Sequence, residues 1–108
     1  MARGYFSAGL TYIEPGTLNV FFLNLVVSAG GLITVSSYLV KKNNQHSASS
    51  LGDSPAVTIS SVITGEVIER RWYRDGLLHR DGGLPAVVSY EGGEAEKEAW
   101  FFEGVYSR

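Results

Sequence analysis

A long stretch without charge constrains this chain more than any other feature of its sequence. No charged side chain lies between Glu14 and Lys41. The stretch is rich in valine, isoleucine, phenylalanine and threonine, and Gly30-Gly31 interrupts it. β-Branched and aromatic residues favour strands, and a glycine pair between two such runs is typical of a hairpin turn. We therefore predict two antiparallel strands, over residues 17–27 and 32–40.

A single membrane-spanning helix is the alternative for the same residues. The stretch is long enough for the roughly 20 apolar residues that cross a bilayer, and Lys41 and Lys42 would serve as its stop signal. Asn19 and Asn24 favour the hairpin instead, because unpaired amides are costly inside a bilayer.

The first of the two expected strands is apolar on both of its faces. Val20 and Phe22 share one face, and Phe21 and Leu23 share the other. A domain of 108 residues has little material to cover both faces. An uncovered apolar face indicates a protein interface or self-association. Val20 and Phe22 are therefore candidate partner-binding residues, and we expect a homo-oligomer.

The segments around the expected hairpin are short and polar. Residues 1–15 suggest one strand that ends in a Glu14-Pro15-Gly16 turn. The polar run 41–50 is expected to be a loop, with the solvated side chain of His46 in it. It separates an apolar region, residues 1–47, from residues 48–108, and we expect the two regions to pack as one domain.

An internal repeat organises the second region. Trp72–Arg80 reads WYRDGLLHR and Trp100–Arg108 reads WFFEGVYSR, at an offset of 28 residues. Upstream, GDSPAV at 52–57 aligns with GGLPAV at 82–87, at an offset of 30. Residues 51–108 therefore contain two degenerate copies of one unit, in which Trp72 and Trp100 are expected to be equivalent and largely buried.

Each copy of this unit reads as short strands joined by glycine turns. Thr64-Gly65 separates two strands in the first copy, and Glu91-Gly92-Gly93 separates two in the second. Asp75-Gly76 is a strong hairpin signal, because glycine accepts the positive φ of such turns. We predict an all-β or mostly β fold, a meander of short antiparallel strands and hairpins in a single small domain.

The best-preserved part of the repeat carries a resemblance. Residues 72–87 follow the pattern W-Y-x-x-G-x-x-H-R-D-G-x-L-P-A-V. This pattern resembles the tandem repeats of phage and giant-virus proteins, which are relatives in style of MORN-type repeats. The second copy is degenerate, with Ser107 in place of the histidine. The resemblance implies a β-hairpin scaffold and a viral or phage origin, and it implies no reaction.

The sequence offers no catalytic, cofactor-binding or metal-binding residues. It has no cysteine and two histidines, too few ligands for a metal motif. His79 lies close to Asp75 and Asp81, but no nucleophile completes an acid–base pair. We expect His79 to fix a turn through a hydrogen bond. Glu69 and Asp75 flank the basic cluster of Arg70, Arg71 and Arg74, which is expected to form a cross-strand salt-bridge face.

Charge is uneven along the chain. Residues 48–108 carry ten acidic and six basic side chains. Such a balance argues against direct binding of nucleic acid and suits a partner with a basic surface. The candidate residues for that contact form an acidic run: Glu91, Glu94, Glu96 and Glu98.

These observations favour a non-enzymatic protein-binding module. The resemblance suggests a phage or viral accessory protein in the host cytoplasm, which binds and modulates or inhibits a host defence protein. One alternative is a self-assembling structural β protein. The other is a small single-span membrane protein with a cytosolic repeat domain.

Overall fold

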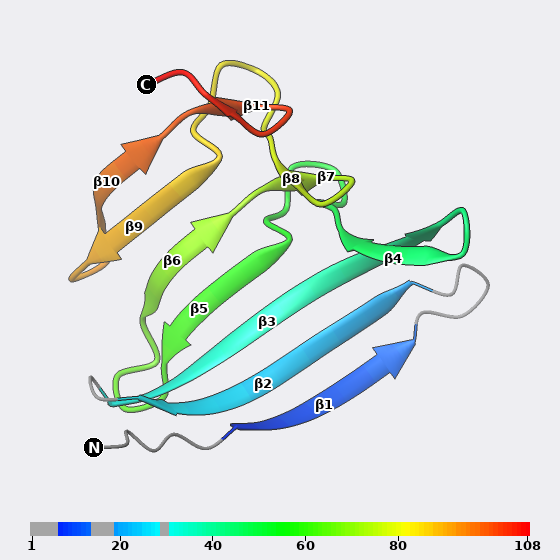
Figure 1. The fold of residues 1–108 in the computed structure, drawn as a ribbon. Helices are drawn as coiled ribbons and strands as arrows, with labels where there is room; N and C mark the ends of the chain where they lie inside the picture. Colours follow the sequence, from blue (N-terminus) through cyan, green and yellow to red (C-terminus); the bar gives the residue numbers. More distant parts are fainter. Residues whose placement is uncertain (1–6, 14–18, 29–30) are drawn as a thin grey trace, which may run out of the picture.

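The computed structural model describes residues 7–13, 19–28 and 31–108. All regular structure in these residues is β-strand, arranged in antiparallel sheets within one small globule (Figure 1). The predicted fold class is therefore confirmed. No helix capable of crossing a membrane occurs in the described ranges.

One eight-stranded sheet follows the order of the chain. Its path is β1-β2-β3-β5-β6-β9-β10, and β4 pairs with the far end of β3. Two short hairpins, β7-β8 and β11-β12, lie off this sheet. The strands of the first part are β1 (Ser7–Ile13), β2 (Val20–Ser28), β3 (Gly31–Lys42) and β4 (Gln45–Ala48). The others are β5 (Val57–Ser61), β6 (Val67–Arg71), β7 (Tyr73–Arg74), β8 (Leu77–Leu78), β9 (Val87–Glu91), β10 (Glu94–Ala99), β11 (Phe101–Phe102) and β12 (Val105–Tyr106).

The apolar stretch forms the predicted hairpin and not a helix. β2 and β3 pair in continuous antiparallel register from Val20↔Leu39 to Ser28↔Gly31. The turn residues 29–30 lie outside the described residues. β1 agrees with the strand expected in residues 1–15, whereas residues 1–6 and the Glu14-Pro15-Gly16 turn also lie outside them.

The expected loop at residues 41–50 is wrong. β3 continues to Lys42, turns at Asn43-Asn44, and returns as β4. Both asparagines have positive φ, 54° and 63°, as a tight hairpin turn requires. The segment is polar because the hairpin projects into solvent, so its side chains from Lys42 to His46 are exposed.

The two repeat copies form β-units of similar construction. β5 to β8 and β9 to β12 follow in the same order, with Trp72 and Trp100 at the same break between strands. The indole Nε1 of Trp72 donates to the Asp53 carbonyl at 2.9 Å, and that of Trp100 donates to the Gly83 carbonyl at 3.0 Å.

The burial of the two tryptophans differs. Trp72 is 5% exposed, as predicted, but Trp100 is only half-buried. The amide of Trp72 donates to Ala86 of the next unit, whereas the amide of Trp100 donates to Arg108 of its own unit. The Trp72 amide thus bonds a residue of another unit and the Trp100 amide does not, and this parallels the difference in burial.

An additional unit, absent from the sequence analysis, precedes the other two; in chain order it is the first unit, and the units of Trp72 and Trp100 are the second and third. Tyr38 occupies the tryptophan position, because its amide donates to the Ala56 carbonyl as that of Trp72 donates to Ala86. The carbonyl of Tyr38 accepts from Ser49, just as Trp72 accepts from His79. The β3-β4 hairpin is therefore the longer counterpart of β7-β8 and β11-β12. These three hairpins follow one another along one end of the sheet (Figure 1).

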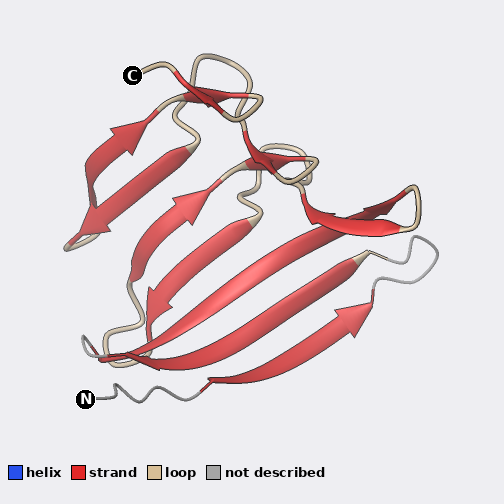
Figure 2. Ribbon diagram, viewed as in Figure 1, coloured by secondary structure: helices blue, strands red, loops and turns tan. Residues whose placement is uncertain are grey.

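The core is small and lies where the strands meet these hairpins. Its buried apolar residues are Ala56, Trp72, Ala86 and Val88. No large side chain in the described part of the chain is fully buried. The main sheet is a single layer of strands (Figure 2), and this explains why most of its residues are half-buried.

Candidate functional site

The apolar candidates Val20 and Phe22 lie on β2, between β1 and β3. Val20 pairs with Leu39, and Phe22 pairs with Ser37. Because directly paired residues share a face, this face continues through Val35 and its partner Ile59 on β5. Val20 and Phe22 are half-buried, which is typical of a sheet face covered only by neighbouring side chains.

The opposite face of β2 is also apolar and accessible. Phe21 is 40% exposed and Val27 is 39% exposed. Both faces of β2 therefore present apolar surface, as the sequence predicted. We call the two faces of β2 and β3 together the apolar sheet region.

The acidic candidates lie at the other end of the sheet. Glu91 ends β9, and Glu94, Glu96 and Glu98 lie on β10, an edge strand. All four are exposed. The carboxyl group of Glu96, held against Glu91, raises the pKa of Glu91 above its ordinary value. Four strands separate β10 from β2, so the structure does not bring the acidic and apolar candidates together.

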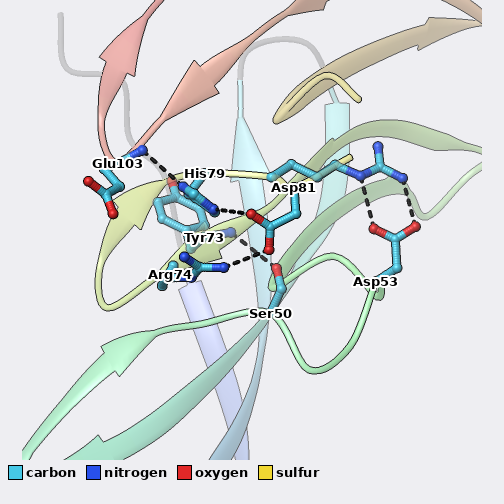
Figure 3. A network of polar contacts seen from close by, with 8 residues as sticks. Ser50, Asp53, Tyr73, Arg74, His79, Asp81 and Glu103 are labelled. Carbon is cyan, nitrogen blue, oxygen red and sulfur yellow. Dashed lines mark hydrogen bonds and ion pairs between the residues drawn. The ribbon is translucent and has the colours of Figure 1, made fainter. Parts of the chain in front are cut away.

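A polar network around the buried side chain of His79 joins the second unit to the third (Figure 3). His79 is 3% exposed and lies directly after β8. Its Nδ1 accepts the backbone amide of Glu103 at 2.9 Å, and its Nε2 bonds Asp81 Oδ1 at 2.8 Å. The ring of Phe102 packs against the imidazole at a centroid distance of 4.6 Å.

These contacts define what His79 can do. A backbone amide donates to Nδ1, so the proton of a neutral imidazole resides on Nε2 and points to Asp81. Both ring nitrogens are engaged and the ring is inaccessible, which leaves no nitrogen to take a substrate proton. His79 fixes a turn, as expected, but the turn is that of the next unit, 24 residues away.

Two exposed carboxylates complete the network. His79 and Arg74 both bond Asp81, and the hydrogen bond from His79 lowers the pKa of this carboxyl below its ordinary value. Arg80 forms a two-point ion pair with Asp53 at 3.0 Å and lowers the pKa of Asp53. The guanidinium of Arg80 also stacks 3.7 Å above the ring of Trp72.

The repeat creates two equivalent clefts. The first encloses about 210 Å³ between the loop at Ser49–Asp53 and the segment Trp72–Arg74. The second encloses about 280 Å³ between the loop at Arg80–Leu84 and the segment Trp100–Phe102. The charged groups of the first cleft are already paired with one another, so the cleft offers no charge to a ligand.

The arginine cluster behaves as a paired surface. Arg71 forms an ion pair with Glu69, and Arg74 bonds Asp81. Arg70 stacks on the ring of Tyr90 across the sheet and donates to its hydroxyl at 3.1 Å. Arg71 and Arg74 are thus in ion pairs, but the expected cross-strand face is wrong, because Glu69 and Arg71 lie on the same strand and Asp81 lies outside the strands.

No cluster of metal-ligating side chains occurs among the described residues. Comparisons of the chain with protein-family models, curated proteins and solved structures found no match.

Sequence reasoning missed the residues that join the first unit to the second. Ser49 Oγ accepts the amide of Asp75 at 2.8 Å, in the place that His79 Nδ1 takes one unit later. Ser50 bonds both the amide and the carbonyl of Tyr73. The sequence signal for the hairpin that positions these serines was the Asn43-Asn44 pair, because adjacent asparagines tolerate the positive φ of a hairpin turn.

Proposed function

We propose that this protein is a non-enzymatic protein-binding module that acts through its apolar sheet region. The observation that carries the proposal is a single-layer sheet whose β2 strand has accessible apolar side chains on both faces. Folded domains normally cover such a sheet with a second layer. A partner surface is the natural second layer, because burial of apolar area drives association.

More specifically, we propose that the chain is a viral accessory protein that binds and modulates a host protein. Its support is the resemblance of residues 72–87 to viral tandem repeats. The engaged state of both nitrogens of His79 is consistent with a role without turnover.

Self-assembly is the second candidate, and the same surface favours it. Two copies stacked face to face through β2 and β3 would form a sandwich with an apolar centre. A two-fold interface of this kind is closed and needs no further protein.

A pair of matched variants tests the proposal. Val20→Thr/Phe22→Thr changes one face of β2, and Phe21→Thr changes the other, while threonine keeps the strand propensity. Each variant is compared with the original chain for mass in solution and for capture of proteins from host extract, with circular dichroism as the control for folding.

The outcomes separate the candidates. Loss of a captured partner from a monomeric chain supports partner binding. Conversion of an oligomer to a monomer supports self-assembly. Folded variants of both faces that keep the original mass and the original captured proteins would refute the proposal.

A further inference from the structure

The turn of the second unit docks on the hairpin of the first through two backbone amides. The amide of Asp75 donates to Ser49 Oγ at 2.8 Å, and the amide of Gly76 donates to the Ala48 carbonyl at 2.8 Å. A Cβ on Gly76 would lie 3.5 Å from Cβ of Ser47. The acid–glycine turn therefore rests directly on the last residues of the preceding hairpin.

The turn of the third unit repeats this arrangement. The amide of Glu103 donates to His79 Nδ1 at 2.9 Å, and the amide of Gly104 donates to the Leu78 carbonyl at 2.8 Å. A Cβ on Gly104 would lie 3.3 Å from Leu77 Cδ2. In both interfaces, therefore, the end of one hairpin accepts hydrogen bonds from the turn amides of the next unit.

The last hairpin displays the same receiving groups to solvent. By the repeat, Val105, Tyr106 and Ser107 correspond to Leu77, Leu78 and His79. Val105 is 68% exposed and Tyr106 is 63% exposed. Ser107 Oγ donates to the Trp100 carbonyl at 3.2 Å, and the lone pairs of its oxygen remain available as acceptors. We call Val105, Tyr106 and Ser107 the terminal platform.

The arrangement of the sheet argues against a second copy of this chain as the occupant. The Asp75-Gly76 and Glu103-Gly104 turns already donate to the hairpins before them, so the turn that a second copy would offer is Asn43-Asn44, in its first unit. If that turn docked on the terminal platform in the same way, β2 of the incoming copy would lie directly beside β10 in the sheet. In the incoming copy, however, β1 already pairs with that edge of β2. Its β1 would therefore clash with β10 of the first copy.

We propose that the terminal platform binds a β-hairpin of another protein, one that carries an acid–glycine turn and a net positive charge. The turn amides would donate to the Tyr106 carbonyl and to Ser107 Oγ, and the turn glycine would rest on Val105. A net positive charge would complement β10, whose side chains Glu94, Glu96 and Glu98 lie exposed at the adjoining edge. This site is separate from the apolar sheet region and does not depend on the function proposed above.

A cyclised peptide probes the platform of the full chain. The peptide has the sequence of Trp72–Arg80, closed head to tail so that its Asp-Gly turn is held in place. Titration into the ¹⁵N-labelled chain should shift the amide resonances of Val105, Tyr106 and Ser107 and of β10. A peptide with alanine in place of the turn glycine is the matched control, because the added Cβ would meet Val105.

Two variants of the chain make the test decisive. Ser107→Ala removes one acceptor and should weaken binding about fivefold, the effect of one hydrogen bond. Val105→Glu leaves a residue exposed but places charge where the glycine must rest, so it should abolish the shifts. A peptide with both arginines replaced by glutamine should bind more weakly and lose its dependence on salt.

The contrary results are equally specific. Absence of shifts at millimolar peptide would overturn the proposal. So would shifts that spread over β1 or the Asn43-Asn44 turn, or binding that Val105→Glu and the alanine peptide leave unchanged. None of these readouts involves Val20 or Phe22, so failure here leaves the proposed function of the apolar sheet region standing.

Discussion

Substitution of His79 by alanine removes the buried acceptor that joins the second unit to the third. The amide of Glu103 then loses its partner at 2.9 Å in a part-buried contact, and leaving such a donor unsatisfied costs about 1–3 kcal/mol. The contact with the Phe102 ring adds about 0.5–1.5 kcal/mol. The bond to exposed Asp81 adds little, because solvent screens it. We therefore expect a loss of about 2–4 kcal/mol in the free energy of unfolding, and a Tm lower by roughly 8–16 °C.

His79→Ser is the matched control, because Ser49 already fills the equivalent place in the first interface. A serine hydroxyl restores an acceptor without the ring, and it should recover about 1 kcal/mol relative to alanine. Hydrogen exchange supplies the specific readout. The amide of Glu103 should lose protection in His79→Ala, while the amide of Asp75, which Ser49 accepts, should keep it. If serine is no more stable than alanine, or if both amides stay protected, the hydrogen bond does not join the units.

Three further outcomes follow from the repeat and its charges. Trp72→Ala should cost about 3–5 kcal/mol and Trp100→Ala clearly less in urea unfolding, because Trp100 is only half-buried; equal costs would contradict this difference. Gly104→Ala should destabilise the fold more than Gly93→Ala, because their φ values are 84° and 87° but only Gly104 lies against Leu77; equal Tm values would show that contact with the preceding hairpin is unimportant. The lowered pKa values of Asp53 and Asp81 give stability that is present above their ordinary value of 3.8 and is lost as pH falls through the lowered values. The urea concentration at the midpoint of unfolding should therefore decrease when the pH is lowered below about 4. The double variant Asp53→Asn/Asp81→Asn should show a smaller decrease.

The sequence was sufficient for those elements whose signals are local. Gly30-Gly31 between two β-branched runs predicted the β2-β3 hairpin, and Asp75-Gly76 predicted the β7-β8 turn. The spacing of Trp72 and Trp100 predicted two like units, and each indole nitrogen does bond a carbonyl in the loop before its unit's Pro-Ala-Val segment.

The first unit escaped prediction because all of its marker residues are replaced. Tyr38 stands for tryptophan and Asn44 for the turn glycine. The latter exchange is understandable, since asparagine tolerates the positive φ of 63° that Asn44 adopts. The β3-β4 hairpin is also longer than its counterparts, so a search at a fixed offset does not find it. The hydrogen bonds of Tyr38 to Ala56 and Ser49 identify the unit in the structure.

The separation of the candidate surfaces was equally inaccessible to sequence, because it depends on the order of strands. Five strand spacings of about 4.8 Å place β10 roughly 24 Å from β2. That distance exceeds the Debye length of about 8 Å at physiological ionic strength. The field of the acidic strand is therefore largely screened at Val20 and Phe22. Its field acts instead beside the terminal platform, and the two ends of the sheet form surfaces of different chemistry that one chain can present independently.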